Sequence, residues 1–166
     1  MVVEMPRVLD RFDVSLLNLL QADNLATAET LAREVALSPS AIARRVRGYR
    51  RDGLIAGDAA ILAPELTADR LRAVVQVQVH EHAEEKGIAS LRARLRAAPE
   101  VQLLLSIAGP VDLLLLVVTR DMARFNAFAD RYFAQDPAVR RYETSIVRAE
   151  IKNLPSVWLD ERDCAD

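Results

Sequence analysis

Residues 37 to 51 constrain the fold of this chain more than any other segment, because they encode an amphipathic helix with one charged face. Ser38 is a good N-cap, and Pro39 suits the first helical position, where its missing N–H would have no partner in any case. Apolar side chains then recur at helical spacing and form one narrow stripe: Ile42, Val46 and Tyr49. The opposite face is polar and contains no acid: Ser40, Arg44, Arg47 and Arg51.

A shorter helix is expected directly before this one, over residues 27–35. Leu31 and Val35 lie at i and i+4, and Ala32 is small enough for close contact between helices. Two short helices joined by a tight turn, the second one basic and capped, are typical of a helix-turn-helix. The alternative that stays open is a small helical domain that offers the basic face to a protein partner.

If the second helix enters a DNA groove, its N-terminal part lies deepest. We therefore expect base contacts from the residues of its first turns: Ser38, Ser40, Ala41 and Arg44. We expect phosphate contacts from Arg47 and Arg51, and from Arg45 at the flank. Double-stranded DNA is thus the predicted partner of this face.

The remaining N-terminal residues complete a small domain. A first helix is expected to begin near Asp10, with Asp13 at the positive end of its dipole, and its buried face comprises Phe12, Leu16, Leu17, Leu19 and Leu20. A turn at residues 52–53 precedes residues 54–62, which the pattern assigns to a strand pair or an extended arm, typical of a wing. We predict a winged helix-turn-helix domain over residues 1–62 and a linker over residues 63–70.

From residue 71 the pattern changes to that of an α+β domain. Val75, Val77 and Val79 alternate with polar residues, as expected for a strand, and a helical pattern follows up to Pro99. Two apolar runs, 101–107 and 111–118, then favour a hairpin, and they precede a helix capped by Asp121 and a last extended run, 139–151. The order βαββαβ predicts a ferredoxin-like domain over residues 71–155, followed by a C-terminal tail over residues 156–166.

Such a domain covers only one face of its sheet with helices, yet residues 101–105 and 113–117 are apolar on both faces. Burying apolar surface stabilises by about 25 cal/mol per Å², so we expect this sheet to pack on a second copy in a homodimer. A dimer also suits DNA binding, because two recognition helices can contact two half-sites.

Bulk composition is compatible with this interpretation. The net charge is −2, but five arginines lie within residues 44–51, so a local positive patch remains on a weakly acidic chain of 166 residues. The single cysteine, Cys164, cannot form an internal disulfide, which favours a reducing cytoplasm. The apolar runs are too short to span a bilayer, so we expect a soluble cytoplasmic protein with no membrane partner.

The ordered series of motifs resembles the Lrp/AsnC, or feast/famine, family of transcription regulators. The matching segments are residues 9–13 with Leu16, Leu17 and Leu20, then residues 37–40 with 45–47, then 52–55, and finally 109–112. The resemblance implies an N-terminal domain that binds DNA and a C-terminal RAM-type domain that dimerises, assembles dimers into tetramers or octamers, and senses small molecules, usually amino acids.

Two positions depart from the family pattern. Ala36 stands where the family often has a glycine, and an alanine at positive φ would cost on the order of 1 kcal/mol. The family's effector loop often reads Gly-Asp-x-Asp, whereas this chain has Gly109-Pro110-Val111-Asp112. The resemblance implies effector contacts from Gly109, Asp112 and Thr144, and both a working amino-acid site and a simple turn stay open for this loop.

Other chemistry finds little support in the pattern. His80 and His82, with Glu81 or Glu84, lack a further ligand at a suitable spacing, so we expect no metal and no cofactor. Motifs for phosphate loops or nucleophile elbows are missing, so we do not expect an enzyme. Trp158 and Met122 are interpreted as packing residues. The main alternative, suggested by Ala36 and Pro110, is a metabolite-sensing or hetero-assembling module without DNA binding of its own.

Overall fold

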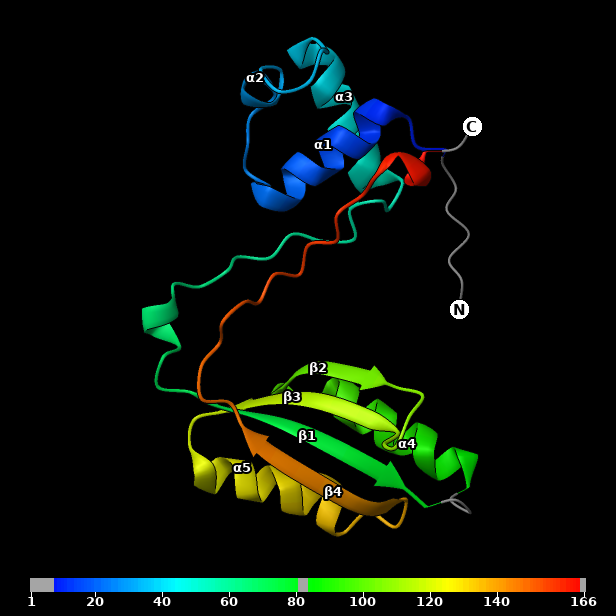
Figure 1. Ribbon diagram of the computed structural model, residues 1–166, viewed down its shortest axis with the longest axis vertical. Helices are drawn as coiled ribbons and strands as arrows, with labels where there is room; N and C mark the ends of the chain where they lie inside the picture. Colours follow the sequence, from blue (N-terminus) through cyan, green and yellow to red (C-terminus); the bar gives the residue numbers. More distant parts are fainter. Residues whose placement is uncertain (1–7, 81–83, 165–166) are drawn as a thin grey trace. The chain divides into compact units, whose positions relative to one another are not determined.

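The computed structural model describes residues 8–80 and 84–164, which form two compact units. The sheet unit consists of residues 62–80 and 84–151. The helical unit combines residues 8–61 with residues 152–164. The sheet of one unit and the helices of the other are seen in Figure 1. None of the described helices combines the length and apolar character needed to cross a membrane.

The helical unit is built from three helices, α1 (Arg11–Ala22), α2 (Ala28–Leu31) and α3 (Pro39–Arg51). Each has the side-chain cap that its sequence favours. Asp10 and Asp13 form a reciprocal capping box at α1, Thr27 caps α2, and Ser38 caps α3. Their apolar sides share one core, whose fully buried members include Leu16, Ile42 and Tyr49. The predicted three helices are therefore confirmed.

One local feature of this unit differs from the sequence prediction, and another decides between its two alternatives. The second helix ends at Leu31, and the residues up to 37 continue as turns, although Val35 still reaches the core. No strand pair forms within residues 54–62. Leu54 and Ile55 pack on the core, whereas Ile61 and Leu62 are exposed, so nothing buries the later residues as a wing strand. The wing position is thus taken by an extended arm.

The C-terminal segment is held by α1 rather than projecting as a free tail. The side-chain amides of Asn18 and Gln21 each form two hydrogen bonds with the backbone of one C-terminal residue, as neighbouring strands do in a sheet. Asn18 donates to the carbonyl of Leu159 (2.9 Å) and accepts from its N–H (3.0 Å), and Gln21 does the same with Val157 (2.8 and 2.7 Å). Trp158 is 80% exposed and Met122 is 46% exposed, so their interpretation as packing residues was wrong.

The sheet unit is a four-stranded antiparallel sheet with two principal helices. Its elements follow in the order β1 (Leu71–Val79), α4 (Glu85–Ala97), β2 (Val101–Ser106), β3 (Leu113–Thr119), α5 (Met122–Ala129) and β4 (Val139–Ile146). The strands lie side by side in the order β2-β3-β1-β4 (Figure 1). This is the predicted ferredoxin-like arrangement, and a π-helical turn, Asp130–Ala134, extends α5.

Alternation along the strands decides which face of this sheet is covered. Val75, Val77 and Leu115 are completely buried and pack with side chains of both helices, such as Leu91 and Phe128. Their neighbours in sequence point to the other face. There the register pairs Leu103 with Leu116, Leu105 with Leu114, and Val74 with Leu116. Leu103 and Leu105 remain 42% and 43% exposed, so the part of this face on β2 and β3 is apolar and is not covered by the described helices of the unit.

Candidate nucleic-acid interface

Helix α3 begins at a polar turn whose groups are partly committed to the fold. The Ser38 Oγ accepts the Ala41 N–H (3.3 Å) and lies 3.2 Å from the Ser40 Oγ. Ser38 therefore fixes the first turn of the helix, while the side chain of Ser40 is exposed. Ala41 adds no bulk beyond Cβ at this end. A ligand could approach the backbone of the first turn closely.

Three of the expected DNA-binding arginines lie on the exposed side of α3: Arg44, Arg47 and Arg51. Among the described residues, neither Arg44 nor Arg47 is paired with a carboxylate. Arg51 is 76% exposed and donates to both oxygens of the adjacent Asp52, at 2.8 and 3.1 Å. The face is cationic and its guanidinium groups are directed to solvent, as binding to a polyanion requires.

Arg45 occupies a different position from the one that the sequence suggested. Its guanidinium contacts Asp13 at 2.6 Å and Asp10 at 2.9 Å, and it lies over the ring of Phe12. The side chain is only 22% exposed. The reason is helical spacing, because Arg45 follows Ile42 by three positions and precedes Tyr49 by four, which places it beside the buried stripe. Arg45 joins α3 to α1 rather than extending from the cationic face.

The partner of Arg45 is a buried carboxylate. Asp13 is 1% exposed, and its Oδ1 accepts hydrogen bonds from the Tyr49 hydroxyl and from Arg45, both at 2.6 Å. Burial alone would raise the pKa of Asp13, but hydrogen bonds from Tyr49, the Asp10 N–H and Arg45 outweigh it and leave the pKa below its usual value. Burial, with the bond to Asp13, raises the pKa of Tyr49, so its hydroxyl stays a donor.

This network fixes how α3 sits on α1. The sequence pattern places Asp13 only at the positive end of the helix dipole and Tyr49 only in the apolar stripe. A signal was nevertheless present, because an acid in a helix's first turn and an Arg and Tyr spaced i, i+4 on the partner helix are complementary. Sequence reasoning missed the pairing because Asp13 lies 32 positions from Arg45 and 36 positions from Tyr49 along the chain.

The turn before α3 is unstrained. Every described residue with positive φ is a glycine, and the one such position is Gly53, at 76°. Ala36 therefore adopts an ordinary conformation, and the cost expected for an alanine at positive φ does not arise. Gly53 stands just after α3, where its N–H bonds the carbonyl of Arg50 and the chain reverses.

The loop expected to hold an effector is folded onto the end of β1. The Asp112 N–H donates to the Val77 carbonyl (2.9 Å), and its Oδ2 accepts the Val79 N–H (2.8 Å). The Gln78 side chain donates to the Pro110 carbonyl at 2.7 Å. Gly109 is exposed. Asp112 thus has a structural role that its position in the sequence did not reveal, with one carboxylate oxygen already engaged.

Thr144 is not adjacent to this loop within one chain. Thr144 lies on β4 and pairs with Val75 of β1, and β1 lies between β4 and the segment that contains Asp112. Of the histidine pair considered as metal ligands, His82 and Glu81 lie outside the described residues. Within the described part of the chain, no group of three or more His, Cys, Asp or Glu side chains is placed to hold a metal ion.

Comparisons with known families cover both units. Residues 9–50 match the AsnC-type helix-turn-helix domain, and residues 72–157 match the Lrp/AsnC ligand binding domain. The first match contains α1, α2 and all of α3 except its last residue, and the second contains the sheet except for the first residue of β1. The helix-turn-helix match therefore precedes the ligand-binding-domain match along the chain.

Relatives and solved structures agree with these matches. An HTH-type transcriptional regulator of Sinorhizobium fredii is 31% identical over 144 residues, 87% of this chain and 85% of that protein. The regulatory protein DoeX of Halomonas elongata is 30% identical and spans 95% and 98%. The complex of a Neisseria meningitidis transcriptional regulator with L-methionine superposes with a TM-score of 0.80 at 30% identity, covering 90% of this chain and 96% of that one. The chain belongs to the Lrp/AsnC family of DNA-binding transcriptional regulators.

Proposed function

We propose that this regulator contacts double-stranded DNA through the N-terminal half of α3, with sequence discrimination carried by Arg44. The single observation that supports this most is the exposed, acid-free face of the helix, on which Arg44 and Arg47 have no carboxylate partner among the described residues. Arginine forms bidentate hydrogen bonds with guanine in the major groove. Ser40 and Ala41 permit close approach beside it.

The other side chains take different roles in this proposal. Arg47 and Arg51 bind phosphates, Arg51 after exchanging Asp52 for a phosphate oxygen. Ser38 holds the helix start and offers its backbone to DNA. Arg45, which the sequence placed among the phosphate contacts, instead positions α3 through Asp13. The alternative of a module without DNA binding loses one of its two motives, because the turn at Ala36 is unstrained.

Quantitative mobility shifts with the upstream region of its own gene test these roles. Arg44→Ala should relax preference at one base position by about 1 to 3 kcal/mol, whereas Arg51→Ala should weaken all duplexes and lower the salt slope by about 1. Arg96→Ala, an exposed arginine of α4, is the matched control and should change neither. Equal losses on specific and random DNA from both α3 variants would contradict the assignment.

We also propose that the uncovered sheet face binds a second copy. Val74, Leu103, Leu105, Leu114 and Leu116 form an apolar surface that none of the described helices of the sheet unit covers. A second copy provides the same surface under two-fold symmetry, and a dimer presents two α3 helices to two half-sites.

Sedimentation velocity tests this association and also reveals any tetramer or octamer. Leu105→Asp should shift the protein to monomer and weaken operator binding, because it puts a charge in an apolar interface. Met122→Asp alters an exposed apolar residue on α5 and is the control. A wild-type chain that sediments as a monomer would refute the dimer.

An amino-acid effector is proposed for the loop Gly109–Asp112. Its support is the family match of the domain and the L-methionine found in the complex of the Neisseria regulator. Asp112→Asn keeps an oxygen for the Val79 N–H but removes the charge that an ammonium group needs. Calorimetry with L-methionine and a panel of amino acids should show binding to the wild type and its loss in this variant. No heat from any amino acid would make the loop a turn only.

A further inference from the structure

The sheet unit contains an open cleft at the end opposite the Gly109–Asp112 loop. It lies where β1 begins, β3 ends and α5 begins, and has a volume of 630 Å³. The register fixes this separation, because Leu71 pairs with Thr119 at the cleft while Val77 pairs with Leu113 beside the loop. The cleft is therefore a site distinct from the expected effector loop.

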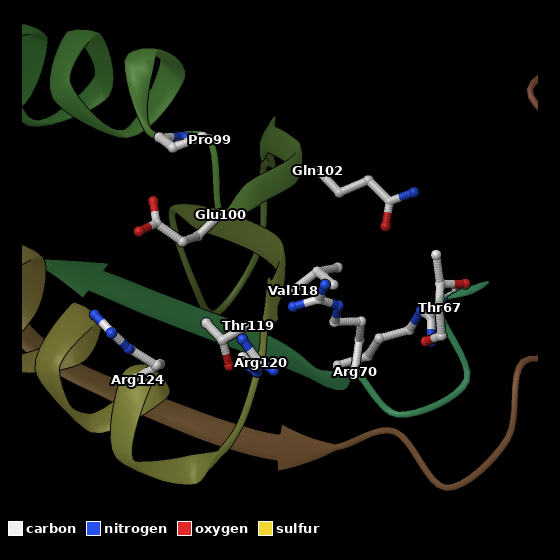
Figure 2. A pocket seen from close by; sticks show the side chains of 10 residues that line it. Thr67, Arg70, Pro99, Glu100, Gln102, Val118, Thr119, Arg120 and Arg124 are labelled. Atoms are coloured by element: carbon white, nitrogen blue, oxygen red, sulfur yellow. Dashed lines mark hydrogen bonds between the residues drawn. The ribbon is translucent and has the colours of Figure 1, made fainter. Parts of the chain in front are cut away.

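Four arginines line this cleft against a single carboxylate. They come from three separate segments: Arg70 and Arg72 from the start of β1, Arg120 from the turn after β3, and Arg124 from α5. Figure 2 shows Arg70, Arg120 and Arg124 along one side, with Pro99, Glu100 and Gln102 across from them. No binding function assigned above uses any of these residues. Their convergence from distant parts of the sequence concentrates positive charge at one place.

Three of the four guanidinium groups remain available for a ligand. Within residues 8–80 and 84–164, Arg120 and Arg124 have no carboxylate partner, and Arg70 approaches only Asp69, at 3.9 Å. Arg72 is different, because it donates to the carbonyl and hydroxyl of Thr67 and lies 3.8 Å from Glu150. Arg72 thereby holds Thr67 in place as part of the wall.

The rest of the cleft adds apolar surface, one amide and one carboxylate. Val118 and Pro99 supply apolar contacts, and the exposed Gln102 offers an amide. Glu100, on the far side, can accept a hydrogen bond from a hydroxyl or amino group. A volume of this size lies within the range of small-molecule sites, which run from about 300 to 1,000 Å³.

We propose that this cleft binds a phosphorylated small molecule with at least two negative charges. Guanidinium groups bind phosphoryl oxygens through paired N–H donors, and three available groups can neutralise more charge than a single carboxylate brings. A zwitterionic amino acid has no net charge and gains little here. Val118 and Pro99 contact the uncharged part of the ligand.

The cleft also involves residues of the sheet unit that precede β1. Thr67 and Arg70 lie in the stretch that leads into β1, within or next to the predicted linker of residues 63–70. A ligand that contacts Arg70 and Arg120 together restrains this stretch against the end of β3. Binding should therefore slow amide hydrogen exchange in residues 67–72.

Calorimetry at low ionic strength on the full chain, with pyrophosphate and AMP as probes, tests the proposal. We expect saturable binding to the wild type and a rise of about tenfold or more in the dissociation constant for Arg120→Gln combined with Arg124→Gln. The two single variants serve if the double variant does not fold. Arg96→Gln removes the same charge from an exposed site on α4 and should bind as the wild type does.

Several outcomes would overturn the proposal. If the wild-type protein bound neither probe saturably, no site for them would exist. If Arg96→Gln weakened binding as much as the cleft variants do, the attraction would be non-specific. Citrate binding more tightly than pyrophosphate would refute the phosphate class. L-methionine provides the separate readout for the effector loop, because the arginine variants should leave its binding unchanged and Asp112→Asn should leave pyrophosphate binding unchanged. Failure of either site is therefore distinguishable from failure of the other.

Discussion

The two units of this protein are stabilised in different ways. The DNA-binding unit places a carboxylate, Asp13, at its centre and joins two helices through Tyr49 and Arg45. The sheet unit has a core of apolar and aromatic side chains, such as Val77, Leu115 and Phe133, within a backbone hydrogen-bonded ladder. A helix must hold a defined rotation about its axis to present one face, and directional polar bonds can specify that rotation. A sheet gains its register from the ladder instead.

The largest expected effect comes from removing the buried carboxylate. Asp13→Ala should lower the stability of the helical unit by about 3 to 5 kcal/mol, because it leaves Tyr49 without its acceptor and removes one of the two acids that neutralise Arg45. Hydrogen exchange monitored by mass spectrometry should show faster exchange in α1 and α3 and little change in β1 and β3.

The matched control for this experiment lies in the other unit. Leu115→Ala removes a fully buried apolar side chain and should produce the reverse pattern, with faster exchange in the strands. If both variants accelerated hydrogen exchange equally in both units, the contrast between a unit held by a buried polar network and a unit held by apolar packing would not hold.

A smaller effect is expected from Tyr49→Phe. This substitution removes only the hydroxyl that donates to Asp13 and should cost about 2 kcal/mol, since a hydrogen bond to a charged group is lost. Chemical denaturation of the full chain, followed by helical circular dichroism, measures the change. The ring remains in the core, so a negligible loss would argue that packing rather than the hydrogen bond matters at this position.

Acid should act selectively on the helical unit, with a smaller effect still. The pKa of Asp13 in the folded protein lies below its ordinary value of 3.8, so the carboxylate stabilises the fold above that pH and this contribution falls as the pH drops through the lowered pKa. Exchange in α1 and α3 should therefore accelerate below about pH 4, after correction for intrinsic exchange rates. Asp13→Asn should lack this dependence, and an unchanged acid response in that variant would assign it to other groups.

The smallest effects concern the C-terminal segment. Asn18→Ala removes both side-chain bonds to Leu159 and should cost about 1 kcal/mol, whereas Trp158→Ala, at an exposed indole, should change stability by less than about 0.5 kcal/mol. Thermal unfolding measures both. A larger loss for the tryptophan variant would mean that the indole contacts another copy of the chain.

Local patterns were sufficient to predict most elements of the fold. Asp10, Ser38 and Asp121 mark helix starts in the sequence, and each caps its helix in the structure. The alternation at Val75 and Val77 identified the buried face of β1. Such signals act over a few residues. Of the two forms expected for residues 54–62, the extended arm is present and the strand pair is not, because strands need a partner and this segment has none within the described chain.

The candidate sites were harder to predict. Arg45 looked like its neighbours Arg44 and Arg47 in the sequence, and only the position of α1 shows that Asp10 and Asp13 occupy its guanidinium. The cleft of Arg70, Arg120 and Arg124 had no sequence signature, because those arginines stand on three separate segments.

The sequence alone therefore determined the element types, the order βαββαβ, the cationic face of α3 and the family, because these follow from periodicity, capping and motif order along the chain. Tertiary structure decided which arginine and aspartate side chains are exposed to ligands and which are bonded within the protein. It buried Asp13 against Arg45, folded Asp112 onto β1 and gathered four arginines at the end of β3. Such choices depend on distances between segments far apart in sequence, which no local pattern encodes.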